Sequence, residues 1–251
     1  NMVGSRNVLT QGMISKENTI YIVQYDYDLN AATIVMPDNC ILQFDGGSID
    51  NGTLKGNSTK IQSDLVRIFG DNIAFSGTFN VANVYAEWWG AKSYVHKQSH
   101  INTDFPFWDT PEEVTELPDC APAFNKALDF CGKYAGGVVR ALATMYKVES
   151  TITIPAETSL YTEESTYFIV YMQGDGRTVV TQNLDTYKFS NETLDENAYV
   201  LSFNQLIATE SMAVAFKMNS RRTSFKGRGT ISINHSRYTI GLLISGNYYD
   251  G

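Results

Sequence analysis

Apolar residues along most of this chain recur in short steps that fit strands and not helices. In the stretch ILQFDGGSIDNGTLKGNSTKI, residues 41–61, the apolar positions are separated by the pairs Gly46-Gly47, Asn51-Gly52 and Gly56-Asn57. These residue types accept positive φ angles and therefore turn the chain sharply. The pattern predicts short strands that are joined by tight corners.

Residues 1–85 continue this pattern without any helical period. The segment NTIYIVQYDYDL, residues 18–29, alternates as a strand does, and ATIVMPDNCILQF supplies two more strands around the turn Pro37-Asp38-Asn39. A circuit of roughly 20 residues with several short strands is typical of a β-solenoid, in which each coil covers the apolar face of its neighbour. A compact β-sandwich is the alternative.

The segment from residue 84 to residue 119 has no sustained period and is rich in aromatic residues and proline. We interpret it as a long connecting loop with some ordered packing. Large aromatic side chains usually pack, so we expect Trp88 and Trp89 to lie in the interior. Trp108 fits packing and stacking on a sugar about equally.

One helix is predicted, at about residues 120–134. Apolar residues recur there in three- and four-residue steps up to Cys131, Asp119 can cap the first turn, and Gly136-Gly137 ends the helix. From Val138 onwards the pattern returns to strands and turns. The sequence thus predicts a mostly β protein with a single capping helix between two series of coils.

Composition and charge narrow the functional classes. The chain has 251 residues and a net charge of −8, which argues against nucleic-acid binding because phosphate neutralisation needs a basic face. No apolar run approaches the roughly 20 residues of a membrane span, so no membrane insertion is expected. The later part is locally basic, and we interpret its cations as a solvated face: Lys217, Arg221, Arg222, Lys226, Arg228 and Arg237.

The cysteines and histidines give no metal or cofactor site. The three cysteines, Cys40, Cys120 and Cys131, have no C-x-x-C spacing, and we interpret them as unpaired, with a Cys120–Cys131 disulfide as the alternative. His96 and His100 have the H-x-x-x-H spacing of a helical metal site, but their surroundings are those of a polar loop. With His235 they are the only histidines, and we predict neither a metal nor a cofactor.

The order of elements around the helix resembles a known family. The segments EWWGAK, PDCAPAFNKALDFCG and GGVVRALATMYKVESTITIPAETSLYTEES stand in the order found at the start of the pectate-lyase-like right-handed parallel β-helix family. The resemblance covers residues 85–165. It implies that residues 119–251 begin such a β-helix, after a β-rich leader over residues 1–85 and a connecting loop over residues 86–118.

The leader, residues 1–61, is similar to the segment that precedes such β-helices in tail-spike and tail-fibre proteins of bacteriophages of gut bacteria, including the crAss-like phages. The resemblance implies a virion appendage, made in the host cytoplasm, that attaches to other tail proteins through residues 1–85. It also implies recognition of a bacterial surface polysaccharide, with or without depolymerisation. A secreted bacterial polysaccharide lyase or hydrolase and a non-catalytic structural adaptor of the virion are the alternatives.

Assembly as a homotrimer is a further expectation from this resemblance. A slender solenoid has much lateral surface, and a closed threefold ring buries matching patches on every copy. Tyrosine and arginine are enriched in such contacts. The candidate interface residues are Tyr238, Tyr248, Tyr249, Arg221, Arg222 and Arg237. Packing in the core is the alternative for the three tyrosines.

An enzyme of this family would need paired carboxylates on one face of the solenoid for hydrolysis, or a base and a cation for elimination. The acidic candidates are Glu163, Glu164, Asp175, Asp185, Glu192, Asp195, Glu196 and Asp250, and none is part of a repeated D-x-D pair on a strand. We interpret Asp175, between two glycines and before Arg177, as part of a turn, with a carboxylate–arginine site as the alternative. Catalytic residues are therefore unassigned, and we expect the native chain to continue beyond Gly251, because an uncapped end would expose strand edges.

Overall fold

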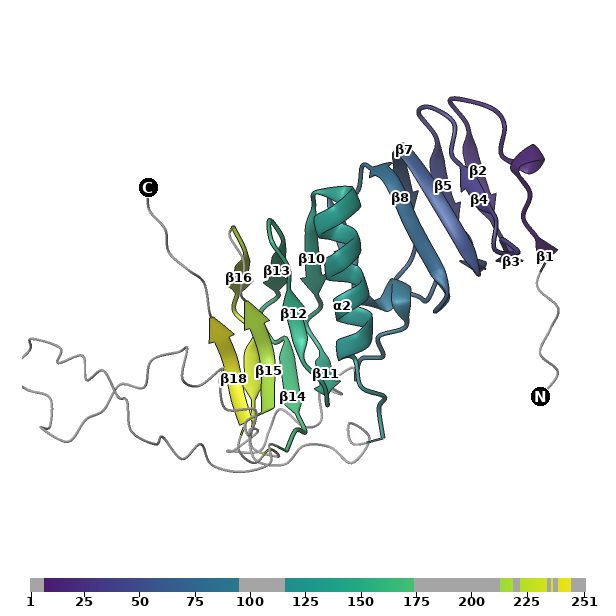
Figure 1. The fold of residues 1–251 in the computed structure, drawn as a ribbon. Coiled ribbons are helices and arrows are strands. Elements are labelled where there is room, and N and C mark those ends of the chain that lie inside the picture. Colours follow the sequence, from purple (N-terminus) through teal and green to yellow (C-terminus); the bar gives the residue numbers. More distant parts are fainter. Residues whose placement is uncertain are drawn as a thin grey trace, which may run out of the picture.

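The strands of this protein stack in parallel along one axis. The structure, a computed structural model, describes residues 7–94, 116–173, 213–218, 222–233, 236 and 239–244. These residues form a parallel β-solenoid of about 8 turns, from the purple N-terminal coils to the yellow last coils in Figure 1. The predicted mostly β solenoid is confirmed. The alternative β-sandwich is wrong, because the strands of a sandwich pair antiparallel, whereas neighbouring coils here pair in parallel.

The first series of coils packs around an apolar interior that includes Ile34, Leu42 and Leu54, all of them buried. Its elements are β1 (Asn7–Val8), η1 (Gln11–Met13), β2 (Ile20–Val23), β3 (Asp26–Asp28), β4 (Thr33–Val35), β5 (Ile41–Phe44), β6 (Ser48–Asp50), β7 (Gly52–Gln62), β8 (Ile73–Phe79), β9 (Asn83–Tyr85) and η2 (Ala86–Trp89).

Successive coils advance by about 20 residues, as the turn spacing predicts. Ile20 lies beside Ile41, and Ile41 lies beside Lys60. The corner before these strands repeats as well, since Asn18 and Asn39 both have left-handed φ angles, of 53° and 55°. The Asn39 side-chain amide donates to Asn18 Oδ1 at 3.2 Å, so the corners are also joined along the stack.

Helix α2 (Ala121–Phe130) begins and ends where the sequence indicates. Asp119 Oδ1 accepts the Ala121 N–H at 3.0 Å and also the Glu149 N–H of a later coil at 2.9 Å. The helix continues as the π turn η4 (Cys131–Ala135) and ends at Gly136, whose φ of 67° is left-handed. No helix within the described residues is long and apolar enough to cross a membrane.

Helix α2 lies between the two series of coils in Figure 1 and contacts both. On one side the centroid of the Phe130 ring lies 4.7 Å from that of the Phe75 ring of β8. On the other side the Phe124 ring lies 5.0 Å from the Tyr146 ring. The helix therefore extends the apolar core from one series of coils into the next.

The second series of coils repeats three parallel sheets. β10 pairs with β9 of the first series and with β13, so the strand ladder continues past the helix. Its strands are β10 (Val138–Ala141), β11 (Met145–Val148), β12 (Ile152–Ile154), β13 (Ser159–Thr162), β14 (Tyr167–Val170), β15 (Ala213–Met218), β16 (Ser224–Gly227), β17 (Thr230–Ser232) and β18 (Thr239–Ile244).

Candidate functional site

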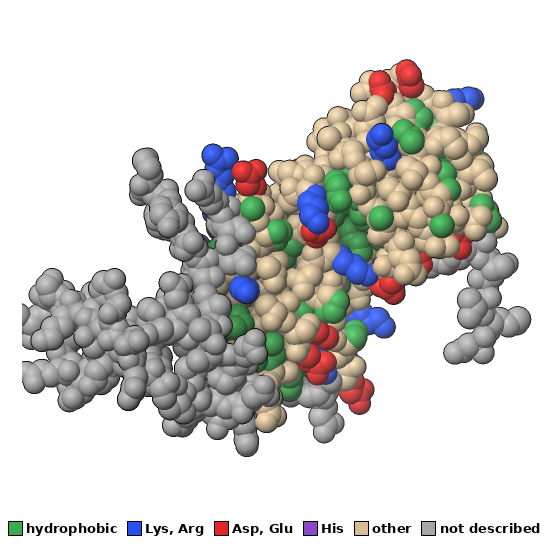
Figure 2. Space-filling view, viewed as in Figure 1, with side chains coloured by type: hydrophobic (Ala, Val, Ile, Leu, Met, Phe, Trp, Pro, Cys, Tyr) green, Lys and Arg blue, Asp and Glu red, His purple; other side chains and the backbone are tan. Residues whose placement is uncertain are grey.

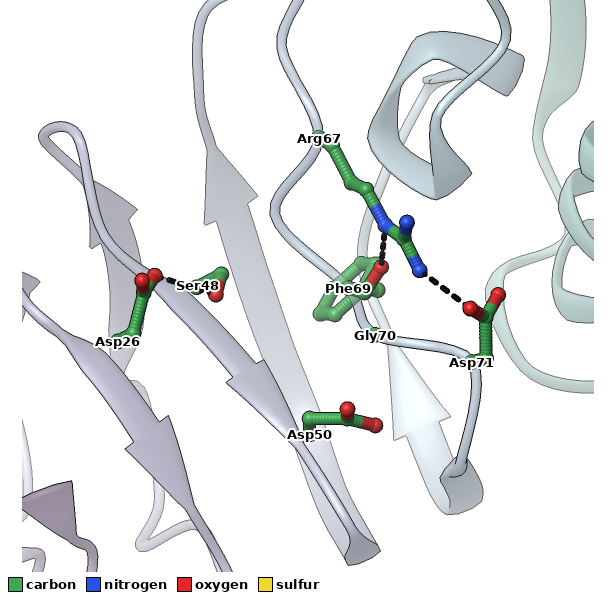
Figure 3. A pocket seen from close by; sticks show the side chains of 7 residues that line it. All are labelled: Asp26, Ser48, Asp50, Arg67, Phe69, Gly70 and Asp71. Atoms are coloured by element: carbon green, nitrogen blue, oxygen red, sulfur yellow. Dashed lines mark hydrogen bonds and ion pairs between the residues drawn. The ribbon is translucent and has the colours of Figure 1, made fainter. Parts of the chain in front are cut away.

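A polar pocket of about 300 Å³ lies on the face of the first coils that carries β3 and β6 (Figure 3). Three successive coils contribute to it, so it runs along the solenoid axis. The residues that line it are Asp26, Ser48, Asp50, Arg67, Phe69, Gly70 and Asp71.

Strand alternation explains why the lining is polar. Side chains in a strand point to opposite faces in turn. Ile49 lies fully buried between Ser48 and Asp50, so these two neighbours face the pocket. In the adjacent strand Asp26 lies beside Ser48 and Asp28 lies beside Asp50. The stack therefore forms rows of polar side chains on this face.

The first wall of the pocket combines a carboxylate with a hydroxyl. Ser48 Oγ donates to Asp26 Oδ1 at 2.6 Å, across two neighbouring coils. Asp26 is exposed, whereas Ser48 is only 9% exposed. The hydrogen bond holds the Asp26 carboxylate at the pocket rim, where its other oxygen can accept from a ligand.

The Asp50 carboxylate lies directly against Gly70. A Cβ atom on Gly70 would lie 2.0 Å from the Asp50 Cγ, so only glycine leaves room for this carboxylate. Asp50 Oδ1 accepts the N–H groups of Asn51 at 2.8 Å and of Asn72 at 2.9 Å. Asp50 thus holds the corners of two coils and also presents its carboxylate to the pocket.

The opposite wall carries the positive charge. Arg67 Nε donates to the Phe69 carbonyl at 3.1 Å, and an Arg67 guanidinium nitrogen lies 2.9 Å from Asp71 Oδ2 (Figure 3). Lys126 of α2 also pairs with Asp71, at 2.9 Å. The hydrogen bond from Lys126 and then that from Arg67 lower the pKa of Asp71, so this carboxylate is ionised at neutral pH.

The side chains that line the pocket can form hydrogen bonds with a polyhydroxylated or charged ligand. Carboxylate oxygens accept from hydroxyls, and a guanidinium donates to them. The Phe69 ring is fully buried against Phe75 and Trp89, so it supports the floor and offers no face to a sugar. Within the part of the chain that the structure describes, no group of three or more His, Cys, Asp or Glu side chains could hold a metal ion.

A second polar cluster lies inside the core. Tyr146 Oη donates to Glu87 Oε1 at 2.6 Å and accepts the Leu142 N–H at 3.0 Å, while Glu87 Oε2 is buried with no hydrogen-bond partner. Burial raises the pKa of Glu87, and the hydrogen bond from Tyr146 opposes this shift. The cluster is closed to a polysaccharide, so its role is structural.

Few of the acidic candidates from the sequence fall within the described residues. Glu163 pairs with Arg140, and Glu164 pairs with Arg228 at 3.4 Å, so both link neighbouring coils on the outer surface. Neither belongs to the pocket. The other candidates, Asp175, Asp185, Glu192, Asp195, Glu196 and Asp250, lie outside the described residues.

Charges of opposite sign are interspersed over the surface in Figure 2. Arg222, like Arg228, forms an ion pair with a glutamate of a neighbouring coil, here Glu157 at 3.4 Å. This agrees with the interpretation of these two cations as parts of a solvated face. The candidate interface residues Arg221, Arg237, Tyr238, Tyr248 and Tyr249 lie outside the described residues.

The aromatic and cysteine predictions are confirmed where the structure describes them. Trp88 and Trp89 are buried, 2% and 6% exposed. All three cysteines are free and buried, so the alternative Cys120–Cys131 disulfide is wrong. Trp108 and the three histidines, His96, His100 and His235, lie outside the described residues.

The pocket residues are not among the acidic candidates from the sequence, all of which follow the helix. The signal lies in the first coils, where Asp26-Tyr27-Asp28 is an alternating acidic pair on a strand, and Asp50 and Asp71 follow at intervals of about one coil.

Comparisons with protein-family models, with curated proteins and with solved structures found no match for this chain.

Proposed function

We propose that this protein is a polysaccharide-binding appendage of a bacteriophage, a tail spike or tail fibre that recognises a glycan on the host surface. The observation that carries the proposal is the polar pocket of Asp26, Ser48, Asp50 and Arg67, which crosses three coils of a parallel β-solenoid. The similarity of residues 1–61 to phage tail leaders supports the virion context.

The geometry suits a glycan for two reasons. Adjacent strands repeat about every 4.8 Å, so equivalent side chains recur along the axis at intervals comparable to a sugar ring. The pocket also joins a hydroxyl, carboxylates and a guanidinium, which together can accept from and donate to hydroxyl groups. Because the coils are fixed by parallel pairing, the pocket is preformed.

Assembly as a homotrimer belongs to this proposal. Three pockets on one rigid body raise avidity by roughly 10² to 10⁴ over a single site when their spacing lets them engage together. Light scattering on the native-length protein tests this step. A monomer at micromolar concentration contradicts it without touching the binding proposal.

The function is tested in two assays. Mass spectrometry of purified phage particles is expected to find the polypeptide, and its absence would remove the virion assignment. Incubation with host surface polysaccharide is expected to show retention of the protein on intact polymer. New reducing ends or unsaturated uronates would identify an enzyme instead, and no glycan binding at all would favour a structural adaptor.

A further inference from the structure

The charges around the pocket restrict the class of glycan that it accepts. Among the described residues, three carboxylates, Asp26, Asp50 and Asp71, line it, against one cation, Arg67. Two of these carboxylates are held in place. Gly70 leaves room for the Asp50 carboxylate, and Ser48 donates a hydrogen bond to the Asp26 carboxylate.

The cation is already paired. Arg67 lies 2.9 Å from Asp71 and also donates to the Phe69 carbonyl. Lys126 of α2 reaches the same Asp71 carboxylate. An acidic sugar would therefore have to compete with Asp71 for the positive charge.

The wall formed by Asp26 and Ser48 carries negative charge and no cation among the described residues. Among the residues that the structure describes, the Asp26 carboxylate accepts one side-chain hydrogen bond, from Ser48, and forms no ion pair with a lysine or arginine. Its exposed carboxylate can only accept hydrogen bonds. A ligand at this wall must donate, through a hydroxyl or an ammonium group, and a carboxylate or phosphate there would meet like charge.

We infer that the pocket binds non-acidic polysaccharides, in which the bound residue is a neutral or an amino sugar, and that Asp26 excludes uronate- and phosphate-bearing polymers. This inference rests on the proposed function, because it assigns a ligand class to the same pocket. Since exclusion comes from charge, it weakens as salt screens the pocket.

The test uses the full chain on an array of bacterial surface polysaccharides sorted into neutral, amine-bearing and acidic polymers. The variant Asp26→Asn keeps an oxygen that can accept from Ser48 but removes the charge. Asp45→Asn is the matched control, because Asp45 bonds Gln24 at 2.9 Å outside the pocket and loses the same charge. Circular dichroism and thermal melting check that each variant is folded.

Three outcomes are distinguishable. The inference is supported if the unaltered protein binds neutral or amine-bearing polymers. In Asp26→Asn this binding should be at least about tenfold weaker, or acidic polymers should bind as well, and in Asp45→Asn binding should be unchanged. Preference of the unaltered protein for acidic polymers overturns the inference and leaves polysaccharide binding in place. No binding to any polymer on the array overturns the proposed function, and the inference with it.

Discussion

The Tyr146 hydroxyl donates a 2.6 Å hydrogen bond to the carboxyl of Glu87, 59 residues earlier in the chain. Tyr146 belongs to β11 of the second series of coils, and Glu87 belongs to η2 at the end of the first. Both are buried, so the bond joins the two series of coils inside the core. Its removal tests how much this polar contact stabilises the junction.

We expect Tyr146→Phe to destabilise the protein by about 1 to 3 kcal/mol, because Glu87 Oε1 and the Leu142 N–H both lose a buried partner. Urea unfolding followed by circular dichroism measures the change. Tyr161→Phe is the matched control, since no hydrogen bond of the Tyr161 hydroxyl occurs among the described residues, and it should cost less than about 0.5 kcal/mol. Equal losses for the two variants would contradict the structural role of the bond.

The raised pKa of Glu87 predicts a pH dependence of stability. Burial favours the neutral carboxyl in the folded protein, so this stabilisation is complete below the ordinary pKa of 4.5. It is lost as the pH rises from 4.5 through the folded-state pKa, by at most about 1.4 kcal/mol per pH unit.

Glu87→Gln is neutral at every pH and lacks this dependence. The free energy of unfolding of the unaltered protein, minus that of Glu87→Gln, should therefore fall between pH 4 and pH 8. The neighbouring titratable groups, Tyr146 and Cys120, do not interfere, because burial raises the pKa of both, that of Cys120 to about 11. A difference that stays constant with pH would show that Glu87 does not titrate in this window.

Gly70→Ala should close the pocket. Its Cβ atom would overlap the Asp50 carboxylate, so the carboxylate or the corner at Asn72 must shift, at about 1 to 3 kcal/mol. Gly12→Ala meets nothing closer than 4.0 Å and should change stability by less than about 0.5 kcal/mol. Thermal melts compare the two variants, and glycan binding by Gly70→Ala is expected to be lost. Unchanged binding would place the glycan elsewhere.

Phe130→Ala should weaken the junction strongly. The ring is 1% exposed and packs against Phe75, Phe79 and Trp89, so truncation leaves a cavity that costs about 3 to 5 kcal/mol. Met13→Ala, at a half-exposed position in η1, is the control and should be nearly neutral. Chemical denaturation measures both. A small effect at Phe130 would mean that α2 is not part of a continuous core.

The cysteines should be inert in the folded protein. Burial raises the pKa of Cys120 and of Cys131 to about 11, so at pH 8 roughly one thiol in a thousand is the reactive thiolate. A thiol reagent such as Ellman's is expected to label none of the three cysteines in native buffer and all three in denaturant. Rapid labelling without denaturant would contradict their burial.

The turn residues made much of the fold predictable. The segments Asn51-Gly52 and Pro37-Asp38-Asn39 predict corners, and the structure has left-handed φ angles at Asn39 and Asn51. Asp119 and Gly136 marked the helix ends, because their chemistry acts within a few residues. Local signals of this kind can be read without knowing which strands pair.

The candidate site was not predictable in the same way. Asp26 and Asp71 lie two coils apart, and only the pairing register brings them to one pocket. Likewise nothing near Glu87 in the sequence indicates Tyr146, since their contact depends on how the fold brings η2 and β11 together in the core. These relationships are set by tertiary stacking and not by local propensity.

The strand ladder of β10, β13 and β16 accepts connections of very different length. Val138 and Ser159 are neighbours 21 residues apart, whereas Ser159 and Ser224 are neighbours 65 residues apart, with the same parallel register. Loop closure entropy grows only with the logarithm of length, so the longer excursion costs only about 1 kcal/mol more. A segment inserted between two rungs therefore costs little stability, as long as the strands on either side keep their register.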